Sequence, residues 1–314
     1  MIDERSTPPL TRRSFVTLSS TAAAAIAAGS WSHGSPESSV HAAEVTSAQR
    51  RAPSPRPIGI ELFSVRRELA RDLPATLRAV AGMGYQVVEF YAPYLNWSVR
   101  YAKDVRTLLD DLALRCYSTH NTFAALTLGA EMARAIELNQ VLGSRQLIVA
   151  SPPPETNGLE DWKRASGQLT TAVMQLESHG LVAGFHNHRV EWTPLAGGQR
   201  IMDVIAANTP PEFVLQLDVG TCMEAGADPI AWIRAHPGRI RSAHLKDWAP
   251  GTEANEKSYR VLFGEGVAPW QQIVAALEST GGVEFYLMEQ EGSRYSEIET
   301  ARRCLDAWRG MGKL

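Results

Sequence analysis

Histidines, carboxylates and one lysine stand at or near the ends of short apolar runs of the sequence. Three pairs of them have i, i+2 spacing, which places both side chains of a pair on the same face of a β-strand. The set comprises His186 and His188, His244 and Lys246, Glu289 and Glu291, together with Glu61, Glu89, His120 and Asp218. Taken singly, each member has an ordinary explanation, as a hydrogen-bonded core histidine or a paired acid. Several ionised groups in one region of low dielectric constant are costly unless they are paired or bind a cation, so the set predicts a shared cation.

Four members of the set are expected to ligate that cation. They lie near the ends of the fifth to eighth apolar runs and are His186, Asp218, His244 and Glu289. Adjacent strands lie ~4.8 Å apart, so such side chains can converge on one ion at ligand distances of ~2.0–2.2 Å. Mixed imidazole and carboxylate ligands suit Mn²⁺, Zn²⁺, Fe²⁺ or Co²⁺ better than Ca²⁺. We therefore expect one divalent ion, with Mg²⁺ as a further candidate, and the sequence does not choose among them.

Eight β-rich runs, each followed by a segment with helical spacing, would position these residues. The runs cover residues 58–65, 85–92, 115–123, 145–151, 181–188, 212–220, 239–247 and 283–291. Alternation of this kind predicts a parallel sheet with helical crossovers, and residues 57–314 match the ~250 residues of a single (β/α)₈ TIM barrel. An open doubly wound sheet is the alternative, but no G-x-G-x-x-G motif follows the first run.

Helix signals lie between the runs. The first helix is expected over Pro74–Met83, with Asp72 as its N-cap. The other helices are expected over residues 103–113, 130–142, 159–179, 198–208, 229–236, 269–280 and 297–309. Left-handed helix ends are expected at Gly84, Gly143, Gly180, Gly238 and Gly281.

The first part of the chain has a different composition. Arg12 and Arg13 precede an alanine-rich run, which is the layout of a twin-arginine export signal and is too short and weakly apolar for a membrane anchor. We expect residues 1–42 to be the signal peptide, 43–56 a disordered linker, and 57–314 the barrel. The expected partner is the twin-arginine export machinery, without a stable membrane anchor, and the expected location is the periplasm or the medium.

Composition limits the other partners. A net charge of −3 without a basic surplus gives no indication of nucleic acid binding. The three cysteines, Cys116, Cys222 and Cys304, have no paired short spacing and are expected to be buried free thiols. The sequence does not decide whether the protein forms an oligomer.

Several motifs together resemble the sugar phosphate isomerase/epimerase family of the xylose-isomerase-like TIM-barrel superfamily. They span residues 58–309 and are GIELFSVR, VVEFY, STHNTF, FHNH, LQLDVGTCMEAGADP, AHLKDW, FGEG and MEQE. The resemblance implies metal ligation by Asp218, His244 and Glu289. At strand five His186 stands where many epimerases carry one of the two glutamates that exchange the substrate proton. A neutral imidazole is still a competent ligand.

The resemblance also implies a chemistry, in which the metal stabilises the enediolate formed when a carbohydrate loses a proton next to its carbonyl. The expected catalytic residues are Glu289 as base, with Lys246, Glu89 and His188 as acids or carbonyl-polarising groups. The expected substrate-binding residues are His120, Phe63, Tyr91, Trp248 and Glu291. Isomerisation or epimerisation of a small, non-phosphorylated carbohydrate is preferred. The alternatives are a lyase or hydratase acting by β-elimination on 3-keto-glycosides, and a sugar-binding barrel without catalysis. A nuclease of the endonuclease IV type is disfavoured.

Overall fold

The computed structural model describes residues 55–153 and 156–312. The expected signal peptide and all but the last two residues of the expected linker lie outside the described residues. Among the described helices, none combines the length and the apolar character that a membrane span needs.

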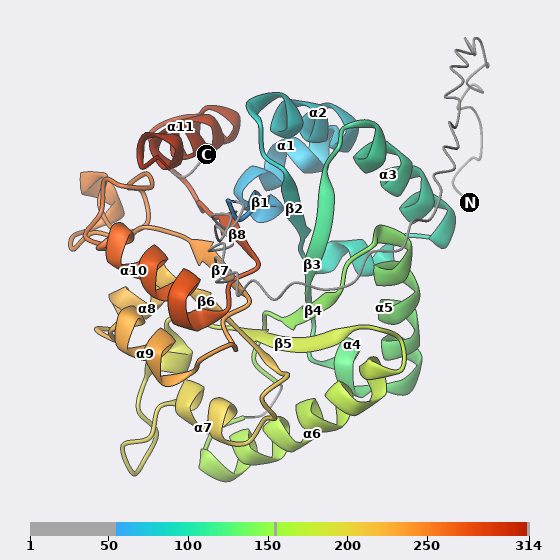
Figure 1. Cartoon of the computed structure of the whole chain (residues 1–314), viewed down its shortest axis with the longest axis vertical. Coiled ribbons are helices and arrows are strands. Elements are labelled where there is room, and N and C mark those ends of the chain that lie inside the picture. Colours follow the sequence, from blue (N-terminus) through green and yellow to red (C-terminus); the bar gives the residue numbers. More distant parts are fainter. Residues whose placement is uncertain (1–54, 154–155, 313–314) are drawn as a thin grey trace, which may run out of the picture. The chain divides into compact units, whose positions relative to one another are not determined.

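Eight parallel strands form a closed barrel in which each strand pairs with the next and β8 pairs with β1 (Figure 1). Their bounds are β1 Ile58–Glu61, β2 Val87–Phe90, β3 Arg115–Asn121, β4 Gln146–Val149, β5 Val182–His186, β6 Val214–Asp218, β7 Ser242–Leu245 and β8 Phe285–Met288. This topology confirms the predicted (β/α)₈ barrel and excludes an open doubly wound sheet.

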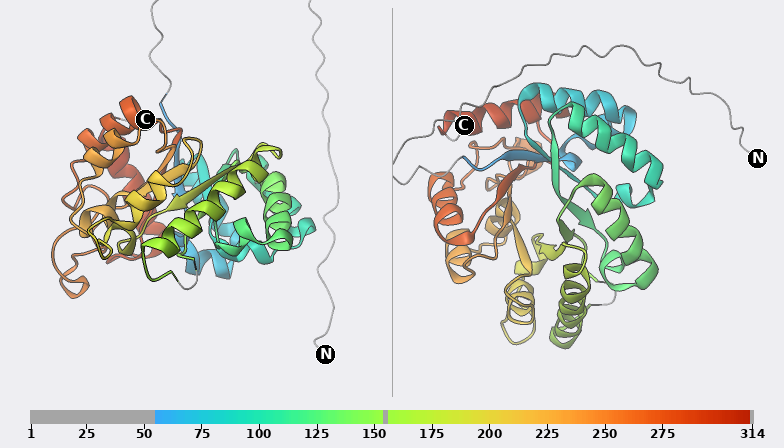
Figure 2. Two further views of the ribbon diagram at one scale, coloured as in Figure 1. Left: turned by 90° about the horizontal axis from the view of Figure 1, so that it is seen from below. Right: turned by 45° about the vertical axis from the view of Figure 1, so that its right-hand side comes forward.

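Helices lie around the outside of the strands, as the further views in Figure 2 show. The α-helices are α1 Arg66–Arg71, α2 Leu73–Met83, α3 Val99–Asp111, α4 Ala124–Thr127, α5 Gly129–Leu142, α6 Leu159–Glu177, α7 Ile201–Ala207, α8 Val219–Glu224, α9 Pro229–Ala235, α10 Trp270–Ala276 and α11 Glu297–Gly310. Shorter helical turns are η1 Leu62–Val65, η2 Ala92–Asn96, η3 Val190–Trp192, η4 Glu253–Asn255 and the π-helical η5 Leu277–Gly281.

Local signals explain the ends of these elements. Asp72 caps α2 by accepting a hydrogen bond from the backbone N–H of Ala75 at 2.9 Å, as predicted. Gly84 ends that helix with a φ of 103°, in the left-handed region. The prediction for Gly281 was wrong, because it closes the π-helical turn and Gly282 takes the left-handed conformation. The predicted strands were too long at their C-terminal ends, as where η1 replaces strand after Glu61.

The strands are buried on both faces, which explains their nearly continuous apolar character. Apolar side chains fill the layer between the strands and the helices and form one large cluster. The three cysteines are buried free thiols, as predicted.

A chain of hydrogen-bonded polar side chains runs through the interior of the barrel. Gln146 on β4 donates to Glu284 at 3.2 Å and accepts from Ser242 on β7 at 3.0 Å. Because β4 and β7 are not neighbours, this bond crosses the barrel interior. Gln216 on β6 then donates to Ser242 and to Glu89 on β2, both at 3.0 Å. This series of hydrogen bonds therefore ends at Glu89, near the carboxyl ends of the strands, where the candidate site lies.

Candidate metal centre at the carboxyl ends of the strands

Four side chains from β5 to β8 converge at the barrel mouth. His186, Asp218, His244 and Glu289 each offer one ligand atom, and these atoms all lie within 4.8 Å of one another. All four residues are buried. The structure thus brings together the group that the sequence predicts as metal ligands.

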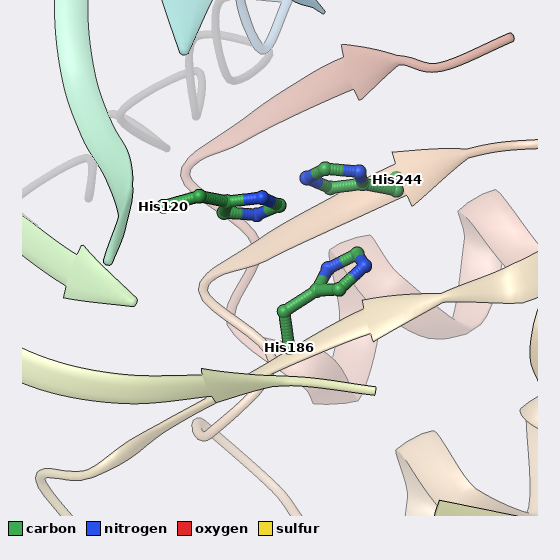
Figure 3. Close-up of side chains that lie close together, drawn as sticks. All are labelled: His120, His186 and His244. Atoms are coloured by element: carbon green, nitrogen blue, oxygen red, sulfur yellow. The ribbon is translucent and has the colours of Figure 1, made fainter. Parts of the chain in front are cut away.

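In each imidazole of this group, one ring nitrogen faces another ligand residue and the second ring nitrogen forms a hydrogen bond that fixes the ring. His244 Nε2 lies 2.8 Å from Glu89 Oε1, while its Nδ1 lies 2.7 Å from Glu289 Oε2. His186 Nδ1 lies 3.0 Å from Gln216 Oε1, while its Nε2 lies 3.9 Å from Asp218 Oδ2. Figure 3 shows both rings, with that of His120, turned toward a common centre. Metal-binding histidines are oriented in this way by an acceptor behind the ring.

Gln216 is a shared support for the histidines. Its Oε1 faces His186 Nδ1 and also His120 Nε2 at 2.8 Å, while its Nε2 donates to Glu89 Oε2. Since the carboxylate needs a donor, this contact sets the orientation of the amide. The Gln216 side chain therefore fixes the orientation of two imidazoles and one carboxylate.

The two carboxylate oxygens of Asp218 differ in their hydrogen bonds. Its Oδ1 accepts from the backbone N–H of Thr221 at 2.9 Å, which caps α8. Asn187 accepts from Asp218 N at 3.0 Å and donates to Asp218 O at 3.2 Å. Within the described chain, Asp218 Oδ2 has no hydrogen-bond partner although it is buried. Such an oxygen is expensive to bury unless it meets a cation.

These residues fit a divalent ion. A carboxylate oxygen without a hydrogen bond in the described chain, two oriented imidazoles and a second carboxylate lie close enough to share one ion. The donor set, two nitrogens and two carboxylates, suits a first-row transition metal. The identity of the metal does not follow from it.

Lys246 supplies a fixed positive charge beside this group. Its Nζ lies 3.5 Å from Asp218 Oδ2 and 3.7 Å from Glu289 Oε1, and it also contacts Glu291 Oε1. The ring of Tyr259 covers it, with its centroid 4.7 Å from Nζ. Burial by itself lowers the pKa of Lys246, but the three carboxylates outweigh it and raise that pKa above its usual value. Lys246 therefore remains an ammonium.

The same charges shift the neighbouring groups. Burial by itself raises the pKa of Glu289, but Lys246 and His244 outweigh it and hold that pKa well below its usual value. Burial opposes protonation of His244, yet Glu89 and Glu289 raise its pKa to about 9. In contrast, burial and then the nearby Glu89 raise the pKa of Glu61 well above its usual value.

Glu89 on β2 contacts the imidazoles of His244 and His120 and two further polar side chains. Its Oε1 faces His244 Nε2 at 2.8 Å and His120 Nε2 at 3.0 Å. Its Oε2 accepts from Gln216 and from Ser118 Oγ. The contacts assign it to orienting the imidazoles, and its predicted catalytic role stays a prediction.

A cavity of about 320 Å³ opens over the site. Its lining residues are Glu61, Phe63, Tyr91, Ala92, His120, Asn121, Ala150, Ser151, His186, His188, Glu289 and Glu291. Four of the five predicted substrate-binding residues are among them. The fifth, Trp248, is not a lining residue, because it follows β7 beyond Lys246 and is partly buried there.

His188 lies at the entrance, with its ring centroid 5.0 Å from that of His186. Its side chain is 43% exposed, so a substrate can reach it. Glu191 accepts from the backbone N–H of His188 at 2.7 Å and lies 3.9 Å from its Nδ1. The fully buried Glu191 therefore anchors the loop that presents His188.

The sequence-based prediction missed Gln216, Asn187 and Glu191. A signal for Gln216 was present, since it forms an i, i+2 pair with Asp218 inside an apolar strand. Asn187 and Glu191 follow β5 in a loop, where polar residues are ordinary. Their role depends on contacts with β6 and with the backbone of His188, which local sequence does not encode.

Comparisons with known proteins agree with this fold. A family model described as xylose isomerase-like TIM barrel matches residues 77–309. Among solved structures, a sugar phosphate isomerase/epimerase from Parabacteroides distasonis is 22% identical with a TM-score of 0.71, covering 85% of this chain and 98% of that one. No curated protein matches the chain.

Two further solved structures are similar in fold. A D-psicose 3-epimerase determined in the presence of D-fructose is 15% identical with a TM-score of 0.57, covering 81% of this chain and 98% of that one. The IOLI protein with a binding zinc atom is 15% identical with a TM-score of 0.61, covering 80% and 97% of the two chains. At such identities the likeness shows the fold.

Proposed function

Because the chain belongs to the xylose isomerase-like TIM-barrel family, we propose that it is a divalent-metal-dependent sugar isomerase or epimerase. The observation that carries the proposal is the convergence of His186, Asp218, His244 and Glu289, with one buried Asp218 oxygen that lacks a protein hydrogen bond in the described chain. The sugar epimerase and isomerase/epimerase names of the structural neighbours support a carbohydrate substrate.

The four side chains would hold the ion through His186 Nε2, His244 Nδ1 and the carboxylates of Asp218 and Glu289. When bound, the ion would polarise a substrate carbonyl and stabilise negative charge on its oxygen. Gln216 and Glu89 keep the two imidazoles in orientation by accepting from their other nitrogens. Metal affinity thus depends on both supports.

Glu289 is the proposed base. Its low pKa keeps the carboxylate ionised at neutral pH, and it lines the cavity. In the proposed reaction it takes the proton from the carbon next to the substrate carbonyl. The Lys246 ammonium remains charged beside it and stabilises the oxyanion that forms.

His188 is the proposed second proton carrier. It lines the same cavity and is accessible from the entrance. Return of the proton to the neighbouring carbon completes an isomerisation, and return to the opposite face of the original carbon completes an epimerisation. Glu191 positions His188 for either step.

Proton exchange in D₂O tests the proposal directly. The Mn²⁺-loaded protein is incubated with a panel of keto-sugars that includes D-fructose, and loss of the ¹H signal next to the carbonyl is followed by NMR. We expect exchange with at least one sugar, and Asp218→Asn should lose both bound metal and exchange. Metal binding without exchange on any sugar would favour a sugar-binding barrel instead.

One observation favours a second candidate, β-elimination on 3-keto-glycosides. At strand five the ligand group contains His186, so Glu289 is the single glutamate among the four. An elimination needs one base, to remove the C2 proton, and one acid, to protonate the oxygen that leaves C1. Glu289 and His188 fill these two roles. Release of the aglycone from a 3-keto-glycoside would distinguish this reaction from isomerisation.

We also propose that the protein is exported through the twin-arginine pathway. The support is Arg12 and Arg13 ahead of the alanine-rich run. Replacing both arginines by lysine should retain the protein in the cytoplasmic fraction. Unchanged recovery from the periplasmic fraction would refute this route.

A further inference from the structure

Glu61 is a buried glutamate that lines the cavity. It is the last residue of β1 and is 1% exposed. Neither of its carboxylate oxygens has a hydrogen-bond partner among the described residues. A buried carboxylate costs free energy unless it is protonated or a cation compensates its charge; in the protein alone, burial and Glu89 raise the pKa of Glu61, and a bound cation would compensate the ionised form.

His120 on β3 presents a second acceptor to the same space. Its Nε2 lies 2.8 Å from Gln216 Oε1 and 3.0 Å from Glu89 Oε1. Both of these atoms accept, so Nε2 carries the hydrogen, and in the neutral ring Nδ1 has the free lone pair. That Nδ1 faces Glu61 Oε1 at 4.0 Å.

The 4.0 Å separation is informative. A direct N–H···O hydrogen bond spans ~2.7–3.2 Å, which is too short for this pair. Two ligands of one ion, each at ~2.0–2.2 Å, can be separated by about 4 Å. Glu89 completes a group with Glu61 and His120 in which one ligand atom from each lies within 4.8 Å of the others. We propose that these three residues hold a second divalent cation.

The surrounding charges support a cation at this place. Lys246 forms ion pairs with Asp218, Glu289 and Glu291. In the described chain, no lysine or arginine forms an ion pair with Glu61, whose one ion-pair contact is His120. With an ion in the ligand group of β5 to β8, the Glu61 carboxylate would still lack a counter-charge, and a second cation supplies it.

The two sites would be neighbours. Glu89 Oε1 lies between His120 and His244, whose rings are stacked with centroids 5.1 Å apart and planes 5° apart. The second ion has fewer protein ligands and borders the cavity, so its remaining positions are open to water or to substrate hydroxyls. We therefore expect it to bind more weakly than the first ion.

Metal stoichiometry tests the second site without reference to activity. The full-length protein is stripped with a chelator and titrated with Mn²⁺; bound ions are counted by ICP-MS after equilibrium dialysis, and spin coupling is followed by EPR. Wild type should bind two ions per chain at saturation, with an EPR spectrum broadened by coupling. Glu61→Gln should bind one uncoupled ion, and His120→Asn should do the same if the first variant folds poorly by circular dichroism.

Glu191→Gln is the matched control, since Glu191 is also buried with one carboxylate oxygen that lacks a hydrogen bond in the described chain, but it belongs to neither ligand group. It should bind two ions. A wild-type protein that saturates at one ion, removed by Asp218→Asn, would overturn the second site and leave the proposed function intact. A raised KM in Glu61→Gln at an unchanged single ion would assign Glu61 to substrate binding instead. No bound ion in wild type would refute both proposals.

Discussion

Two arcs of the barrel mouth carry similar residues but differ in how their charges are compensated. In the β5–β8 arc, Glu289 has Lys246 and His244 beside it, and its pKa falls well below the usual value. In the β1–β3 arc, Glu61 has no hydrogen bond from the described chain, and burial and Glu89 raise its pKa. Two glutamates on adjacent strands are thus driven toward opposite charge states.

The difference shows that a residue's role here depends on its partners more than on its type. Glu89 stands between the arcs and orients His120 and His244. Glu289 faces the cavity with an ammonium beside it and suits proton transfer. Under the proposed function, proton transfer would therefore take place in the β5–β8 arc, and the β1–β3 arc would serve binding.

The largest expected effect comes from Glu289→Gln. General acid–base catalysis contributes ~10²–10⁴-fold, so we expect proton exchange to fall by that factor. His186, Asp218 and His244 remain, so part of the bound metal should be retained by ICP-MS. An exchange rate equal to wild type would move the base to another residue and would break the assignment of chemistry to this arc.

Lys246→Met should have the next largest effect. Removing a charge aimed at a developing oxyanion costs ~10²–10³-fold in kcat, and we expect a loss in that range. Metal affinity should stay the same or increase, because Asp218 and Glu289 lose a competing cation. Lys257→Met, at an exposed lysine of the same loop, is the control and should behave as wild type. Equal activity of both variants would mean that Lys246 is a structural counter-charge.

A smaller effect is expected from Gln216→Met. The variant removes the acceptor behind His186 Nδ1, and loss of such a support weakens metal affinity ~10–100-fold. Gln146→Met is the control: Gln146 is another buried glutamine of the hydrogen-bonded series inside the barrel, and it contacts no imidazole. This variant should bind metal with wild-type affinity. Equal affinities in a competition titration against a chelator would show that His186 does not need its support.

The fold and much of the site composition could be predicted from the sequence, for one physical reason. Parallel strands buried on both faces must be apolar, so both the strand count and any ionisable residue at a strand end stand out. The helices α1, α4 and α8 were missed because four to six residues are too few to show a helical period. The strands were predicted too long because an apolar run can continue into a helical turn, as η1 continues the apolar run of β1.

The side-chain contacts of individual residues could not be predicted from the sequence, as two consecutive residues illustrate. Lys246 contacts the carboxylates of the mouth, whereas Asp247 accepts from the backbone N–H groups of Gly264 and Gly266 and from the indole of Trp270. Asp247 therefore secures the loop after β7, and a Cβ on Gly266 would lie 2.0 Å from its carboxylate. The local sequence does not reveal the roles of these two charged neighbours, because contacts with residues from 17 to 45 positions away determine them.

The smallest expected effect tests how the β5–β8 arc holds its ammonium. Tyr259 donates to Glu224 through its hydroxyl and covers Lys246 with its ring. Tyr259→Phe loses the hydrogen bond and should lower the free energy of unfolding by about 0.5–1.5 kcal/mol, with kcat nearly unchanged. Tyr259→Leu also loses the cation–π contact, worth a further ~0.5–2 kcal/mol, and should lower kcat modestly because Lys246 is less well placed. Urea unfolding and proton exchange measure the two quantities. If Tyr259→Phe lost as much activity as Lys246→Met, the phenol would belong to the chemistry, because the ring alone is enough to position the ammonium.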